Sequence, residues 1–254
     1  MIRCENLSFS YDKKKNFIKD LNININIGKI TTILGPNGSG KSTLLSLLSC
    51  YNKPDNGSVY LDDINLSNIK TKEIAKKIAT VHQENESPED ISVETLISYG
   101  RTPHNKNNKA EDENIINWAI KSTSLEEIRN EKVMSLSGGQ RQRAFIAMAL
   151  AQKTEVLFLD EPTTYLDIYH QIEILEMIKL LNEKYNLTII MVLHDINQAI
   201  KYSDNIIIMK EGKIVEEGKP CDIINDKTIK DVYKVEGIIC NVEEEMYFVP
   251  KSAC

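Results

Sequence analysis

The sequence predicts an α/β protein with a mixed sheet at its core, an antiparallel β region near the start and an inserted helical region. Between residues 21 and 27, leucine or isoleucine alternates with asparagine, which is the period of a strand with one buried face. The continuous apolar runs 156–159, 188–193 and 206–209 are separated by helical segments, which is typical of a parallel sheet. Residues 84–153 instead hold several helical segments joined by polar loops.

The first third of the chain supplies strands and one helix. Residues 30–34 are expected to form a strand, because they follow a turn at Gly28 and lead into a glycine-rich loop. An apolar helical segment over 42–50 comes directly after that loop. An edge strand over 57–61 and a short buried strand over 78–81 are expected next.

The middle and the end of the chain supply most of the helices. Helical segments are expected over 93–99, 110–122, 138–151, 168–184 and 195–201, and after the capping box at 124–127. Glu211-Gly212 closes a final hairpin into Ile214-Val215. The predicted organisation is one domain, 1–254, made of a core (1–83 and 154–220), a helical subdomain (84–153) and a C-terminal tail (221–254).

The composition is that of an ordinary globular protein. A length of 254 residues suits one sizeable core and is too short for an enzyme with its own membrane domain, and the longest apolar runs are far shorter than a membrane span. No secretion signal is visible in the first six residues, and the five cysteines form no Cys-x-x-Cys pair, so we expect reduced thiols. The net charge of −6 argues against sequence-independent binding of nucleic acid. A local basic patch within the acidic average is the alternative.

A phosphate-binding loop is predicted directly after the expected strand 30–34. The segment Gly35-Pro36-Asn37-Gly38-Ser39-Gly40-Lys41-Ser42 matches G-x-x-x-x-G-K-[ST] between a strand and a helix. The glycines let backbone N–H groups point at an anion, Lys41 reaches the β and γ phosphates, and Ser42 ligates Mg²⁺. We count Thr43 among the nucleotide-binding residues as well. The alternative is an ordinary glycine-rich turn before a helix.

Two carboxylates end the apolar run 156–159. Asp160 can hold Mg²⁺ through its waters, and Glu161 can aim at the water that attacks the γ phosphorus. A buried strand that ends in a solvated acidic turn is the alternative. The phosphate-binding loop makes the acidic turn the weaker interpretation, because Mg²⁺ needs a carboxylate near the phosphates.

A second anion site is predicted where Leu136-Ser137-Gly138-Gly139-Gln140 precedes Arg141-Gln142-Arg143. Ser137 is a good helix N-cap, and the two glycines bare the N–H groups of a helix start. A well-capped amphipathic helix is the purely structural interpretation. The segment resembles the signature sequence of ATP-binding cassette (ABC) proteins, which implies a P-loop NTPase fold with a nucleotide-binding core, and a dimer in which Ser137–Gln140 of one copy face the ATP of the other.

The same resemblance implies roles for four further residues. Tyr11 occupies the position of the ring that stacks on adenine, and Gln83 that of the glutamine that touches Mg²⁺ and the attacking water. Asp167 lies in the loop that contacts the partner copy, and His194 matches the histidine that binds the γ phosphate. The structural alternatives are a strand-end tyrosine, a polar loop residue, an N-cap and a satisfied loop histidine. His82, His104 and His170 have no such match and are expected to be structural.

The cassette resembles the separate ATPase of a bacterial importer, because it has no fused membrane helices, second cassette or long coiled-coil insertion. The segments 160–168 and 100–104 resemble those of ferric-siderophore, haem and cobalamin uptake systems. The resemblance implies ATP and Mg²⁺ as cofactors, transmembrane permease subunits docked near residues 84–104, indirect contact with a substrate-binding lipoprotein, and a place at the cytoplasmic face of the membrane. A soluble cassette acting on nucleic acid or ribosomes, and a small-molecule phosphoryl transferase, are the competing readings.

Overall fold

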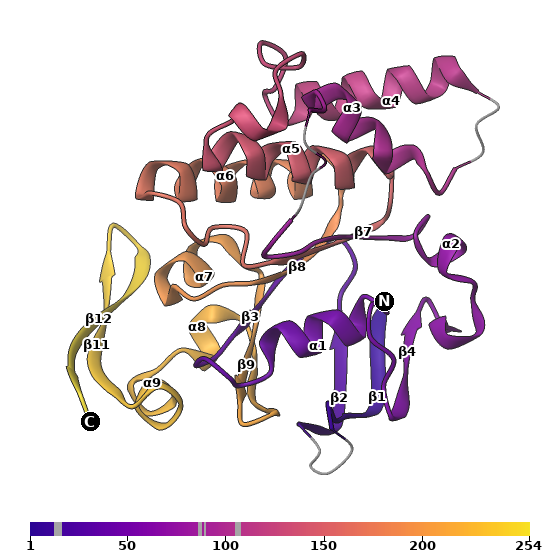
Figure 1. Ribbon diagram of the computed structural model, residues 1–254. Helices are drawn as coiled ribbons and strands as arrows, with labels where there is room; N and C mark the ends of the chain where they lie inside the picture. Colours follow the sequence, from indigo (N-terminus) through magenta and orange to yellow (C-terminus); the bar gives the residue numbers. More distant parts are fainter. Residues whose placement is uncertain (13–16, 86–87, 89, 105–107) are drawn as a thin grey trace. The chain divides into compact units, whose positions relative to one another are not determined.

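The computed structural model describes residues 1–12, 17–85, 88, 90–104 and 108–254, and the chain divides into two compact units (Figure 1). Unit 1 comprises Met1–Asn68 and Thr188–Cys254, and unit 2 comprises Ile69–Leu187. The lysine-rich loop tip expected at 13–15, and part of the one expected at 105–109, lie outside the described residues.

Unit 1 begins with an antiparallel sheet, as predicted. Its strands are β1 (Ile2–Phe9), β2 (Ile18–Ile25), β4 (Asn56–Leu61) and β5 (Ile64–Asn65), in the order β2-β1-β4-β5. The alternation of β2 is confirmed, because Leu21, Ile23 and Ile25 are buried and the asparagines between them are exposed. Two details were wrong: Ile27 lies beyond the strand and is 45% exposed, and β4 is not an edge strand, because β5 pairs with it.

The second sheet of unit 1 is built around β3 (Ile30–Leu34). Strand β3 pairs in parallel with β8 (Thr188–Val192) on one side and with β9 (Asn205–Lys210) on the other. Strand β10 (Lys213–Gly218) pairs antiparallel with β9, so the sheet is mixed and the final hairpin is confirmed. Every residue of β3 and β8 is buried, including Thr31, Thr32 and Thr188, and the other residues of both strands are apolar. Helices α1 (Lys41–Leu48) and α7 (Ile196–Tyr202) follow β3 and β8.

The last segment of unit 1, predicted only as a C-terminal tail, contains two helices and a hairpin. It consists of the short helices α8 (Pro220–Ile223) and α9 (Asp226–Tyr233), followed by an antiparallel hairpin of β11 (Val235–Val242) and β12 (Glu245–Ala253). Figure 1 shows this hairpin in yellow, with β12 beside α7.

Unit 2 holds a parallel strand pair and most of the long helices. Strands β6 (Ile78–Val81) and β7 (Val156–Asp160) run in parallel. The helices are α2 (Thr71–Ile74), α3 (Val93–Ser98), α4 (Lys109–Ser122), α5 (Gly138–Ala151) and α6 (Ile168–Tyr185), with short 3₁₀ turns at Tyr99–Arg101 and Val133–Ser135. No helix within the described part of either unit is both long and apolar enough to cross a bilayer.

The helix predicted after Ser124 does not exist. Ser124 has φ +54°, a left-handed conformation that ends α4 rather than beginning a new helix. The next amide, Leu125 N–H, donates to Ile120 O at 3.0 Å, and the Leu125 side chain is fully buried. This is a helix C-terminus closed by a left-handed residue and a hydrophobic contact, so the segment carries a stop signal that the Ser-x-x-Glu pattern concealed.

Candidate functional site

The loop between β3 and α1 has a backbone that only glycine can supply at its first position. Gly35 has φ +150°, and a Cβ there would lie 2.2 Å from Met209 O in the neighbouring strand β9. Gly40 has φ +102° and is the N-cap of α1. A Cβ on Gly38, by contrast, would meet no atom within 4 Å. The loop is therefore held tightly against β9 at its start and is open at its middle.

Polar groups of this loop converge on the start of α1. The Lys41 side chain is 5% exposed, and its Nζ donates to Gly35 O at 3.0 Å and to Pro36 O at 3.3 Å. Ser39 Oγ is buried and has no hydrogen-bond partner within the described residues. The N-cap of α1 is Gly40, which has no side chain to cap the helix, and the N-terminus of a helix favours an anion. A buried ammonium, an unpaired hydroxyl and an uncapped helix start fit a phosphate group.

Tyr11 is hydrogen-bonded to helix α1. Its hydroxyl lies 2.7 Å from Thr43 Oγ1, while Phe9 and Phe17 pack against its ring with centroid distances of 4.9 Å and 5.6 Å. The tyrosine is nevertheless 67% exposed. An aromatic ring that is fixed in place and still exposed is suited to stack on a flat partner such as a nucleobase.

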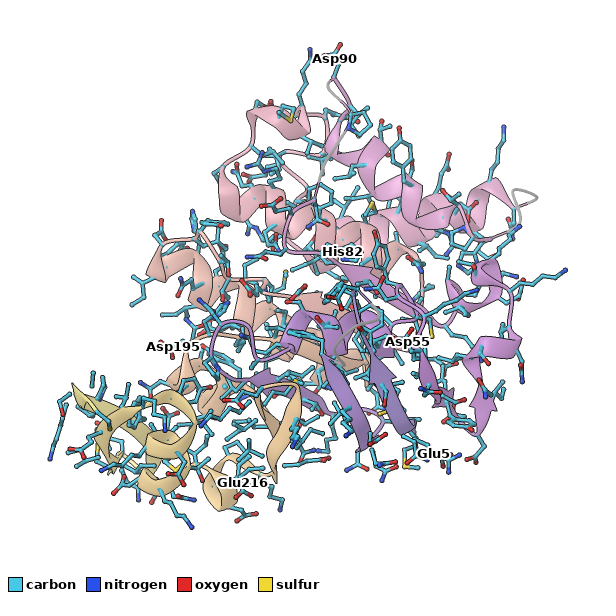
Figure 2. All side chains as sticks on the ribbon, turned by 60° about the horizontal axis from the view of Figure 1, so that its bottom comes forward. Glu5, Asp55, His82, Asp90, Asp195 and Glu216 are labelled. Atoms are coloured by element: carbon cyan, nitrogen blue, oxygen red, sulfur yellow. The ribbon has the colours of Figure 1, made fainter. Side chains whose placement is uncertain are left out.

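His194 lies two residues after strand β8, in the loop that follows it. Leu193 N–H, one residue earlier, donates to Ile33 O at 3.3 Å, and Ile33 is two residues before Gly35. His194 itself is exposed. Asp195, labelled in Figure 2, then caps α7 by accepting from Gln198 N–H at 2.8 Å. The parallel pairing of β3 and β8 thus brings the His194 loop and the phosphate loop to the same end of the sheet.

In unit 2, Glu161 directly follows β7, and its carboxylate accepts hydrogen bonds from two other side chains. Glu161 Oε2 accepts from Gln83 Nε2 at 2.7 Å and from Thr164 Oγ1 at 3.0 Å. Glu161 has φ +51°, a left-handed conformation that costs a non-glycine residue of order 1–3 kcal/mol and is concentrated at functional sites. Gln83 and Glu161 are thus brought together although 78 residues separate them.

Thr164 was missed by the sequence reasoning. It reaches Glu161 because a turn, in which Thr164 N–H donates to Glu161 O at 3.2 Å, folds it back onto the carboxylate. The signal that could have revealed it is the pair of hydroxyl residues, Thr163 and Thr164, placed after Glu161-Pro162 where a tight turn is expected.

The start of helix α5 is capped in the predicted way. Ser137 Oγ accepts from Gln140 N–H at 3.3 Å, and Gln140 Oε1 accepts from Ser137 N–H at 3.0 Å, which forms a complete capping box. Close packing is a second reason for glycine at positions 138 and 139, and the sequence did not suggest it. A Cβ on Gly139 would lie 2.9 Å from the His170 ring, and one on Gly138 would lie 3.1 Å from Leu166. The α5 start therefore packs closely against the beginning of α6.

Two other residues of unit 2 have the structural roles that were expected. Asp167 Oδ1 accepts from His170 N–H at 2.9 Å and is the N-cap of α6. His104 Nε2 lies 2.8 Å from Gln152 O. The segment around it is a packing element as well, because Arg101 donates to Asp112 at 2.7 Å and to Ala151 O at 2.8 Å.

The predicted site residues divide between the units. Unit 1 carries Tyr11, the loop from Gly35 to Thr43 and His194, whereas unit 2 carries Gln83, Asp160, Glu161, Ser137–Gln140 and Asp167. No cluster of three or more histidine, cysteine or acidic side chains suited to a metal ion occurs in the described parts of the chain. All five cysteines are free thiols.

Known proteins match the chain along most of its length. The family model described as ABC transporter matches residues 18–164. The iron(3+)-hydroxamate import ATP-binding protein FhuC of Bacillus subtilis is 43% identical over 241 residues, which cover 94% of this chain and 89% of that protein.

Two solved structures share the fold. One is an inward-facing ABC transporter described as of metal-chelate type, with a TM-score of 0.84 and 28% identity, covering 99% of this chain and 97% of that one. The other is the dimeric ATP-binding cassette MJ0796 in a post-hydrolysis state bound to ADP and Pi, with a TM-score of 0.76 and 31% identity, covering 87% of this chain and 99% of that one. These matches confirm the predicted fold class, and the chain belongs to the ABC transporter family as one of its ATP-binding, ATP-hydrolysing cassettes.

Proposed function

We propose that this cassette is the ATP-hydrolysing subunit of an importer for iron–siderophore complexes. The observation that carries the hydrolytic part is the Glu161 carboxylate, which is fixed by Gln83 and Thr164 at the end of β7. The cargo is supported by near full-length similarity to a subunit of iron(3+)-hydroxamate import and to a metal-chelate type transporter.

Nucleotide binding is assigned to the loop of unit 1. The residues from Gly35 to Thr43 wrap the phosphates of ATP, with Lys41 supplying the positive charge and Tyr11 stacking on adenine. Ser42, Gln83 and Asp160 would hold Mg²⁺, since hydroxyl, amide and carboxylate oxygens are the ligands that this ion prefers. When bound, Mg²⁺ offsets the negative charge of the phosphates.

Hydrolysis is assigned to three side chains. Glu161 takes the proton of the water whose oxygen bonds to the γ phosphorus, while the bond from that phosphorus to the ADP oxygen breaks and releases phosphate. Gln83 fixes the carboxylate through its hydrogen bond to Oε2 and so orients it toward the water. His194 donates a hydrogen bond to the γ phosphate.

The complete site needs a second copy of the chain. The capped start of α5, with Ser137, Gly138, Gly139 and Gln140, supplies N–H groups and a hydroxyl to the γ phosphate bound by the other copy. Asp167 lies in the loop that contacts the partner across the seam. A two-fold dimer makes both sites equivalent, and the dimeric form of the related cassette MJ0796 supports this arrangement.

The remaining partners follow from the importer assignment. Transmembrane permease subunits dock on the helical subdomain (84–153), near residues 84–104, of which 86, 87 and 89 lie outside the described residues. A substrate-binding lipoprotein delivers the cargo without touching this chain. The cassette is thereby held at the cytoplasmic face of the membrane, and no nucleic acid partner is expected.

Iron uptake by cells that lack the gene tests the proposal. Radiolabelled ferric hydroxamate, ferric catecholate, haem and cobalamin are supplied in turn, and the cells are complemented with the parent chain or with Lys41→Ala. Loss of uptake of one ferric siderophore, restored by the parent chain only, supports the proposal. Loss of haem or cobalamin uptake instead would reassign the cargo, and unchanged uptake of all four would favour a cassette that acts outside transport.

A further inference from the structure

Helix α7 determines where His194 lies, because the helix begins two residues after it. The strand β8 ends at Val192, α7 starts at Ile196, and the connection between them is only Leu193, His194 and Asp195. Such a short connection leaves the histidine little freedom relative to the helix. Any movement of α7 therefore moves the His194 backbone.

Asn197, in the first turn of α7, is bound at both ends of its amide to the C-terminal hairpin. Its Oδ1 accepts from Phe248 N–H at 2.8 Å, and its Nδ2 donates to Phe248 O at 3.1 Å. Phe248 lies in strand β12, and its side chain is 7% exposed. The Asn197 amide thus pairs with the backbone of Phe248, 51 residues away, through one donated and one accepted hydrogen bond, as a neighbouring strand would.

An exposed ion pair and a cavity also lie between α7 and the hairpin. Lys201 and Glu245 approach to 3.8 Å, but both side chains are about half exposed, and exposed ion pairs contribute little. A cavity of about 400 Å³ separates the end of α7 from α8 and the hairpin, lined in part by Ile200, Pro220 and Met246. Among the described contacts, the amide of Asn197 is therefore the one that fixes the helix to β12 with directional bonds.

The same C-terminal segment also reaches the phosphate loop. Tyr233, the last residue of α9, has a buried hydroxyl that faces the backbone of Gly35 without completing a hydrogen bond by distance and angle. Burial raises the pKa of Tyr233, and the Gly35 backbone opposes that rise. Lys210, at the end of β9, donates to Asp231 O of α9 at 2.5 Å. The segment thus contacts the phosphate loop as well as helix α7.

We propose that Asn197 is a positioning residue for ATP hydrolysis, which acts by holding α7, and through it His194, against the backbone of Phe248 in the C-terminal hairpin. This inference rests on the role proposed above for His194. On this proposal the segment 221–254 takes part in hydrolysis, although it lies outside the phosphate-binding loop and the Asp160-Glu161 motif. Because the bond acts on a group that meets the γ phosphate during turnover, its loss lowers kcat and leaves nucleotide binding intact.

Steady-state ATPase kinetics of the purified full-length chain test the proposal. Asn197→Ala is expected to lower kcat roughly ten-fold, with the KM for ATP and the dissociation constant of a fluorescent ATP analogue within about two-fold of the parent. Asn197→Asp keeps the acceptor for Phe248 N–H and loses the donor, so its kcat should lie between those of Asn197→Ala and the parent. Asn241→Ala is the matched control, because Asn241 is an exposed asparagine on the same hairpin, and its kcat should equal that of the parent.

His194→Ala, measured in parallel, separates this inference from the proposed function. If His194→Ala loses turnover while kcat of Asn197→Ala, per ATP-binding chain, stays within two-fold of the parent, the positioning role is wrong and the site assignment survives. If His194→Ala keeps parental turnover, the role of His194 is wrong and the inference falls with it. Normalising kcat to the number of chains that bind the analogue removes any contribution from misfolded protein.

Discussion

Gln83 Nε2 donates a hydrogen bond of 2.7 Å to Glu161 Oε2, which joins a loop after β6 to the end of β7. Because the bond is made to one carboxylate oxygen, it fixes the orientation of the Glu161 side chain. Gln83 also leads into the region proposed to meet the permease, so the same bond links the proposed catalytic base to the proposed docking surface. Both ends of the bond are predicted to matter for turnover more than for nucleotide binding.

Glu161→Gln should retain ATP binding and abolish turnover. The amide has nearly the same shape as the carboxylate but cannot accept a proton from water, and general base catalysis contributes roughly 10²- to 10⁴-fold to a rate. Phosphate release should fall by at least 100-fold, and gel filtration with MgATP should show a dimer that persists. Phosphate release near the parent rate would remove Glu161 from its proposed role.

Thr164→Val tests the second hydrogen bond to Glu161. Valine has the shape of threonine without its hydroxyl, so the carboxylate loses the 3.0 Å bond from Thr164 Oγ1 and keeps the bond from Gln83. A net hydrogen bond of about 0.5–1.5 kcal/mol corresponds to roughly a 2- to 12-fold fall in kcat. The matched control is Thr154→Val, whose hydroxyl bonds to Val156 O at the other end of β7. Equal kcat values for the two variants would argue that the Thr164 bond has no part in turnover.

Gly139→Ala should destabilise unit 2 as well as slow turnover. The added methyl group would lie 2.9 Å from the His170 ring, which is closer than real contacts allow, and such overpacking costs typically 1–3 kcal/mol. Replacing His170 by alanine in the same chain should restore part of the thermal stability. If the double variant recovers stability but not ATPase activity, the glycine serves the nucleotide as well as the packing. Recovery of both would show that packing alone selects glycine at this position.

Thiol reactivity should divide the cysteines by burial. Burial raises the pKa of Cys50 to about 11 and that of Cys4 to about 12 from the ordinary 9.0, whereas Cys221 and Cys254 are exposed. A thiol reacts as its thiolate, so at pH 8 Cys50 has about 100 times less reactive form than a thiol of ordinary pKa. Mass spectrometry after alkylation at pH 8 should find label on Cys221 and Cys254 first. Labelling of Cys4 in the folded chain at an equal rate would contradict its burial.

The parts of the fold that a short stretch of sequence determines were predictable. The buried strands β3 and β8 are short runs of apolar residues and threonine, and the phosphate loop is contiguous between a strand and a helix. Strand β1 was not predicted, because Asn6, with φ +51°, interrupts its pairing with β2 between Cys4 and Leu7 and breaks the alternation.

The contacts that could not be predicted join residues distant in sequence. The bond between Gln83 and Glu161 was not predicted, because the family resemblance implied only that Gln83 touches Mg²⁺ and the attacking water, and the packing of Gly139 on His170 was not predicted either. Asn197 and Phe248 carry no motif, and their pairing depends on the path of the C-terminal hairpin. Such contacts follow from tertiary packing, for which periodicity and local propensity contain no signal.

The central claim is that ATP is hydrolysed in a site made by two copies of this chain. A structure of Glu161→Gln with MgATP tests it most directly. The account predicts a two-fold dimer in which Ser137 of one copy lies within hydrogen-bond distance of the γ phosphate held by Lys41 of the other. A nucleotide-loaded structure in which Ser137 is distant from every triphosphate would contradict it.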